Sequence, residues 1–269
     1  MGLFDKLGFG GTKEEKDLRA AQRLGKKVTE KFGPPENRQG AIEELGAMRT
    51  EPAIDALLAR FTIRIDPGIT DDEEKHRVLD LIVAAGKVSL EPIKRFLAAR
   101  DEITWPLEAL GELLSEQEFI QILCGALNRA ATEYSRTSEK KVLLLHALSH
   151  HRAPDAVPAA LPFLDDMDDD VRIAAAQVVC GQLQPLPEGA SAEEQAVAAS
   201  ASTAAQEKGR VPLLEAFLKA HAQGNARVRE ALAGLLADSP FDVKGYTPKF
   251  EAALPETYKL DSKGKIQRA

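Results

Sequence analysis

Apolar residues recur along the chain as adjacent pairs four positions apart, the spacing that places them on one face of an α-helix. Proline stands near the start of each such segment, where its missing N–H leaves no helical hydrogen bond unmade. The pattern therefore predicts a set of similar helices. The leading pairs are Ala53-Ile54, Pro92-Ile93, Ala156-Val157 and Leu213-Leu214.

A second pattern alternates with the first and starts at a short polar or acidic residue. In the clearest copy, Asp170 precedes Val171-Arg172 and an alanine-rich run. Asp, Asn and Ser at such positions cap the free N–H groups of a first helical turn. Except for the last interval, the starts are 31 to 36 residues apart, which predicts about five or six helical hairpins. The predicted starts are Asn37, Asp71, Glu102, Ser138, Asp170 and Asn225.

These features resemble the HEAT-repeat family, especially the short bacterial repeats also found in phycobilisome-lyase-type proteins. The resemblance covers about residues 37–240 and is strongest at 154–161 and 170–175. It implies an all-α fold, an α-solenoid whose stacked hairpins leave a long surface free for a partner. The repeat near Glu102 diverges, because Trp105-Pro106 stands where a capping start is expected.

The chain divides into segments of different character. Residues 1–12 form an amphipathic leader that we expect to be flexible, and 13–36 are expected to form an N-terminal capping helix. The repeat array at 37–240 contains an insertion at about 185–209, which is rich in alanine and serine and is interpreted as a loosely helical or mobile linker. Residues 241–269 are expected to form a C-terminal cap or tail, with a small β-hairpin.

Composition agrees with a helical protein and disfavours nucleic-acid binding, unless a local basic patch overrides the overall charge. Hydrophobic residues make up 44% of the 269 residues and aromatics only 5%, with alanine and leucine dominant. The net charge of −7 repels phosphate backbones. No apolar run approaches the length of about 20 residues that spans a bilayer, and the start does not read as an export signal, so we expect a cytoplasmic protein. Cys124 and Cys180 are expected to be reduced core residues.

Two polar clusters are candidates for chemistry. His146 and His150 share a helix face beside His151, but without a third ligand they are interpreted as a solvated helix end, and no metal is expected. The acidic run starting at Asp165 is interpreted as a helix cap, with contact to a basic partner as the alternative. Its candidate partner-binding residues are Asp165, Asp166, Asp168 and Asp169.

Arg172 and Arg229 occupy matching repeat positions. We interpret them as ties to an acidic side chain of the neighbouring repeat, and contact with a partner is the alternative.

The first residues differ from the repeats. Leu3, Phe4 and Leu7 would share one face of a helix, and this start is similar to that of the glucose-specific phosphocarrier of the bacterial phosphotransferase system. The similarity implies weak contact with an anionic membrane. We favour a partner-binding peptide or a disordered leader over this membrane contact.

The leading functional hypothesis is a non-catalytic scaffold or adaptor that holds a protein partner on its concave face. No catalytic constellation or cofactor motif is present in the sequence. The HEAT resemblance also implies two enzyme alternatives, a bilin lyase and a DNA-alkylation glycosylase. A peripheral membrane adaptor that uses the N-terminal tail is a further alternative. A glycosylase needs a basic groove and aromatic side chains, whereas Trp105 is the only tryptophan in this acidic chain.

Overall fold

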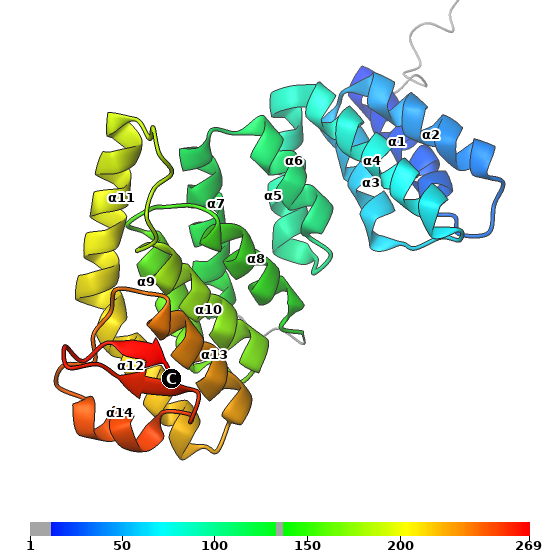
Figure 1. The fold of residues 1–269 in the computed structure, drawn as a ribbon. Coiled ribbons are helices and arrows are strands. Elements are labelled where there is room, and N and C mark those ends of the chain that lie inside the picture. Colours follow the sequence, from blue (N-terminus) through cyan, green and yellow to red (C-terminus); the bar gives the residue numbers. More distant parts are fainter. Residues whose placement is uncertain (1–11, 133–136) are drawn as a thin grey trace, which may run out of the picture. The chain divides into compact units, whose positions relative to one another are not determined.

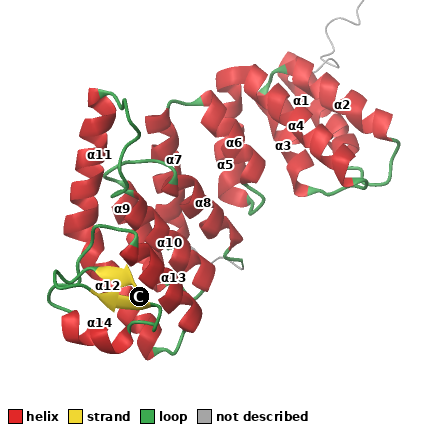
Figure 2. Ribbon diagram, viewed as in Figure 1, coloured by secondary structure: helices red, strands yellow, loops and turns green. Residues whose placement is uncertain are grey.

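A computed structural model describes residues 12–132 and 137–269. These residues form an all-α fold whose only strands make one short two-stranded sheet (Figure 2). Leu3, Phe4 and Leu7 lie outside the described residues. No described helix combines the length and the apolar character that crossing a lipid bilayer requires.

The chain folds as two compact units, Met1–Ser115 and Glu116–Ala269. The first unit has two layers of helices. Its A layer contains α2, α4 and α6, which pack side by side, and its B layer contains α1, α3 and α5 (Figure 1). The described elements of this unit are α1 (Lys13–Val28), α2 (Pro35–Met48), α3 (Glu51–Leu58), the 3-10 turn η2 (Ala59–Thr62), α4 (Gly68–Ala85), the 3-10 turn η3 (Gly86–Ser89), α5 (Leu90–Ala99) and α6 (Thr104–Leu113).

The second unit repeats this two-layer packing. Its A layer contains α8, α10 and α13, and its B layer contains α7, α9 and α12. The described elements are α7 (Glu116–Ala130), α8 (Glu139–Ser149), α9 (Ala156–Ala160), the 3-10 turn η4 (Leu161–Asp165), α10 (Asp169–Gly181), α11 (Ala192–Ala204), the π turn η5 (Ala205–Gly209), α12 (Arg210–Ala222), α13 (Ala226–Ala237), α14 (Thr247–Ala253), β1 (Tyr258–Leu260) and β2 (Ile266–Arg268).

Leucine, isoleucine, valine and alanine fill the space between the layers. In the first unit Leu45, Ile54 and Ile82 are almost completely buried, and in the second Leu145 and Val178 are. The predicted pairs Ala53-Ile54 and Leu213-Leu214 are also buried, as one-sided helices require. Burial of these faces supplies the main favourable free energy of folding.

The first unit also buries a network of five charged side chains. Glu74 Oε2 accepts hydrogen bonds from Arg38 Nε at 2.6 Å and from Arg60 Nε at 2.9 Å. Asp71 accepts from Arg60 Nη2 and from Lys75 Nζ, each at 2.7 Å. Burying these charges costs free energy that only such pairing offsets, so the network fixes α2, η2 and α4 against one another.

Several predicted helix starts were wrong by a few residues. Asn37 and Asp71 lie inside first turns, because α2 and α4 begin at Pro35 and Gly68. Proline fits the first position of a helix without losing a hydrogen bond, so it sets the start of α2. Asp71 is instead drawn inward by Arg60 and Lys75.

The later starts agree better with the sequence. Glu102 precedes α6 by two residues, and Asp168 rather than Asp170 caps α10. Ser138 and Asn225 stand at the predicted positions before α8 and α13, but the Ser138 side chain does not cap its helix and donates to Asp168 instead. The Asn225 side chain accepts the Val228 N–H at 3.1 Å. Polar residues therefore located the starts of the second unit more closely than those of the first.

The inserted segment is more regular than a loose linker. Ser191 and Glu194 form a capping box at the start of α11, and α11 continues through the π turn into α12. Pro212, which has no N–H to donate, follows this turn and therefore lies within a continuous helix rather than near a start.

The small C-terminal hairpin is confirmed. β1 and β2 pair antiparallel, with Leu260 opposite Ile266. Asp261 Oδ1 accepts hydrogen bonds from the N–H groups of Lys263 and Lys265 across the turn.

The predicted repeat near Glu102 would join α6 and α7 in one helical hairpin. The structure places these two helices in different units.

Candidate functional site

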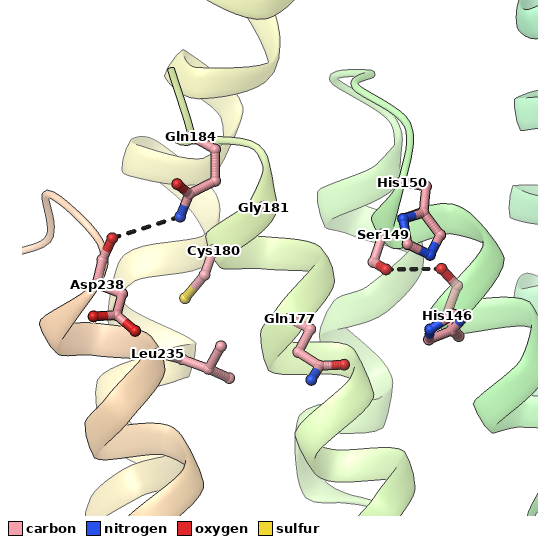
Figure 3. Close-up of a pocket in the computed structure, with 9 residues that line it drawn as sticks. All are labelled: His146, Ser149, His150, Gln177, Cys180, Gly181, Gln184, Leu235 and Asp238. Carbon is pink, nitrogen blue, oxygen red and sulfur yellow. Dashed lines mark hydrogen bonds between the residues drawn. The ribbon is translucent and has the colours of Figure 1, made fainter. Parts of the chain in front are cut away.

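A pocket of about 360 Å³ opens between the C-terminal ends of α8, α10 and α13, the A layer of the second unit. Figure 3 shows His146, Ser149 and His150 on one side of it and Asp238 on the other, with residues of α10 between them. Packing of α8 and α13 against α10 brings these three helix ends together, and the sequence alone did not identify the pocket.

The α8 side of the pocket holds two histidines in contact. The rings of His146 and His150 lie 4.7 Å apart, nearly perpendicular, and Ser149 Oγ donates to the His146 carbonyl at 2.7 Å. His151 contacts Glu116 Oε1 through Nδ1 at 2.8 Å instead. Across residues 12–132 and 137–269, no three His, Cys, Asp or Glu side chains are grouped so as to hold a metal ion.

Cys180 forms part of the pocket wall on α10. Burial, with a smaller contribution from Asp238, raises the pKa of its thiol to about 12. Burial likewise raises the pKa of Cys124 to about 11, with Asp155 adding to the effect. Both cysteines are buried and unpaired, which confirms their prediction as reduced core residues. At neutral pH a thiol with such a pKa stays protonated and is a poor nucleophile.

The α13 side of the pocket offers polar groups that are already in use. The Asp238 carbonyl accepts from Gln184 Nε2 at 3.5 Å, and the Asp238 carboxylate pairs with Arg268 Nη2 at 2.8 Å. Gln177, in the middle of the pocket, is exposed, and no other described residue hydrogen-bonds to its side chain. The pocket thus presents an amide, two imidazoles and Leu235, a surface suited to contact rather than to acid–base chemistry.

The acidic segment beside η4 lies at the opposite end of α10 and connects several elements. Asp168 caps α10: its Oδ1 accepts the N–H of Asp170 at 2.9 Å and that of Val171 at 3.2 Å. Its Oδ2 accepts a hydrogen bond from Ser138 Oγ at 2.6 Å. The Ser138 hydrogen bond, opposed by burial and supported by the two backbone bonds, lowers the pKa of Asp168. The capping interpretation is therefore confirmed for Asp168.

The neighbouring aspartates are paired as well. Asp166 Oδ2 lies 2.8 Å from Lys141 Nζ, and Asp165 forms an ion pair with Lys219. Asp169 Oδ1 accepts from Asn225 Nδ2 at 2.7 Å. These side chains join the start of α10 to α8, α12 and α13. Contact between these aspartates and a basic partner stays a prediction.

The arginines make different ties from those expected. Arg172 is buried, and its Nη1 donates to Gln223 Oε1 at 3.3 Å, while Asp169 of its own helix lies 3.8 Å away. Arg229 Nη1 lies 3.3 Å from His221 Nδ1. Within the described part of the chain, neither arginine reaches a carboxylate of a neighbouring repeat. That expectation was wrong because the facing α12 end provides an amide and an imidazole.

No protein-family model, curated protein or solved structure matches the chain. The pocket residues Gln177 and Gln184 were not among the sequence candidates. Their only signal in the sequence was position, because both lie near the C-terminal end of α10.

Proposed function

We propose that the chain is a HEAT-like α-solenoid that acts as a non-catalytic interaction scaffold and binds a protein partner on the A layer. In the second unit the contact surface is the pocket at the ends of α8, α10 and α13. The single observation that carries this proposal is that each unit has a pocket on its A layer, between α2 and α4 in the first and between α8, α10 and α13 in the second.

The polar character of the pocket supports binding over chemistry. Its thiol is held protonated, and its carboxylate is paired with Arg268. An uncharged surface that combines hydrogen-bonding groups with an apolar side chain fits the charge-poor centre of a protein–protein interface. The A layer is the concave face in this proposal.

Site-specific photocrosslinking tests the proposal. A photoreactive amino acid replaces Gln177 of α10 in the full chain, which is irradiated in the cells that express it. Gln121 of α7 provides the matched control, because it is also an exposed glutamine on a helix, but in the B layer of the same unit.

We expect one defined protein to crosslink from position 177 and not from position 121. A Gln177→Ala variant carrying the photoreactive group at Gln184 should give less of the same product. Equal products from positions 177 and 121, or none from either, would contradict the proposal.

A further inference from the structure

The A layer of the first unit is strongly acidic. Helices α2, α4 and α6 carry ten carboxylates and three cationic side chains. Eight of these carboxylates are exposed, three on α2, three on α4 and two on α6, whereas Arg77 is the only exposed cation among these three helices. Arg77 itself is held by both Glu43 oxygens, at 2.6 Å and 2.7 Å. Like charges at this density repel one another, and a cationic ligand would relieve that repulsion.

The B layer of the same unit has no such excess. Helices α1, α3 and α5 carry eight cationic and six acidic side chains. The acidity is therefore a property of one layer rather than of the whole unit. An incoming basic chain would be steered toward α2, α4 and α6 over distances of about one Debye length, roughly 8 Å at physiological salt.

A pocket of about 290 Å³ lies within this acidic layer, between α2 and α4. Gln39, Ile42, Glu43, Glu73, Glu74 and Arg77 line it, and the Arg77 guanidinium is paired with Glu43. The Glu74 side chain is 3% exposed, and its Oε1 is buried without a hydrogen-bond partner, whereas its Oε2 accepts two arginines. A buried carboxylate oxygen without a hydrogen-bond donor costs free energy. A ligand that donates a hydrogen bond to Glu74 Oε1 would remove this cost.

Glu73 adds a second acceptor at the same place. It is exposed and forms no ion pair within the described part of the chain, because the Arg77 guanidinium that shares the pocket is paired with Glu43 instead. An arginine or lysine side chain entering the pocket would pair with Glu73 and donate to Glu74 Oε1. Arginine fits better, because its planar guanidinium presents several donors at fixed angles.

We propose that the acidic A layer of the first unit binds an arginine- and lysine-rich protein segment, with one cationic side chain seated in the pocket between α2 and α4. This surface lies in the other unit from the pocket shown in Figure 3, and the proposal assigns it a partner chemistry that the proposed function leaves open.

Fluorescence anisotropy with two labelled peptides tests this proposal. The probe is hexa-arginine, and its uncharged counterpart is hexa-citrulline, each titrated with the full chain at 0.15 M NaCl. One variant removes three carboxylates of the acidic layer, Glu36→Gln, Glu73→Gln and Asp80→Asn. A control variant removes three exposed carboxylates elsewhere, Glu14→Gln, Glu251→Gln and Glu256→Gln, and so has the same net charge.

We expect hexa-arginine to bind and hexa-citrulline not to bind. The acidic-layer variant should bind hexa-arginine at least about tenfold more weakly than the wild-type chain, and the control variant should stay within about threefold. Equal losses in both variants would show a diffuse attraction to net charge and would overturn the proposal, as would the absence of hexa-arginine binding. A crosslink from Gln177 would not be affected by either result, so the two proposals fail separately.

Discussion

Asp71 is a buried charged residue of the first unit that is stabilised by its hydrogen-bond partners. Asp71 is buried and accepts hydrogen bonds from Arg60 Nη2, Lys75 Nζ and the Ile65 N–H. Burial raises its pKa, but the bonds from Lys75 and Arg60 outweigh burial and hold the pKa below its ordinary value. The sequence pattern predicts Asp71 at a helix start and does not reveal the buried network. Arg38 precedes Asp71 by 33 residues, and no local pattern shows that it pairs with Glu74.

The Asp71→Asn substitution should destabilise the first unit by about 3 to 5 kcal/mol, because it leaves buried cations without their partner. The exposed pair of Glu43 and Arg77 provides the control, and Glu43→Gln should cost less than about 1 kcal/mol. Urea unfolding followed by the fluorescence of Trp105, the only tryptophan, reports on this unit. Equal costs for the two variants would show that the network adds no stability.

The same network should make this unit sensitive to acid. The pKa of Asp71 is lower in the folded state than in the unfolded state, so its contribution to stability is complete above about pH 4. That contribution is lost as the pH falls through the folded pKa. The Asp71→Asn variant should therefore lose less further stability between pH 5 and pH 3 than the wild-type chain does, measured by the same fluorescence.

At the scale of helices, periodicity located most elements, and the deviations have local causes. The helix expected at residues 13–36 forms as α1, which ends at Val28, although Leu18 in it is 44% exposed. From the sequence, the insertion is interpreted as a loosely helical or mobile linker because its alanine- and serine-rich composition is low in complexity. The insertion is ordered by a capping box at the start of α11 and by close packing of the π turn. That packing involves segments distant in the sequence, so no local pattern predicts it. Likewise, α14 has only seven residues, too few for a periodic signal.

Gly209 tests the packing of that π turn. A Cβ atom there would lie 2.6 Å from Val179 Cγ1 and 3.3 Å from Val157 Cγ1, so Gly209→Ala should destabilise the protein by about 1 to 3 kcal/mol. Gly125 in α7 is the matched control, since its Cβ would meet only the Arg129 guanidinium at 4.0 Å. Gly125→Ala should stabilise the protein by about 0.5 to 1 kcal/mol. Calorimetric unfolding that ranks the two variants in the opposite order would refute this account of the turn.

At the scale of the whole molecule, the sequence predicted an all-α fold correctly, and it missed both the division into two units and the surfaces. The division falls between α6 and α7, inside the predicted repeat in which Trp105-Pro106 departs from the sequence pattern. Surfaces were harder to predict, because a pocket between α8, α10 and α13 joins residues that are up to 92 positions apart in the sequence. The net charge of −7 is a property of the whole chain. It does not reveal that the A layer of the first unit is acidic and the B layer is not.

Hydrogen–deuterium exchange of the chain with the partner that Gln177 captures tests the central proposal most directly. The proposal predicts slower exchange at the C-terminal ends of α8, α10 and α13, with α7 and α12 unchanged. Slower exchange confined to α7, α9 and α12 would contradict it, because the partner would then bind the B layer.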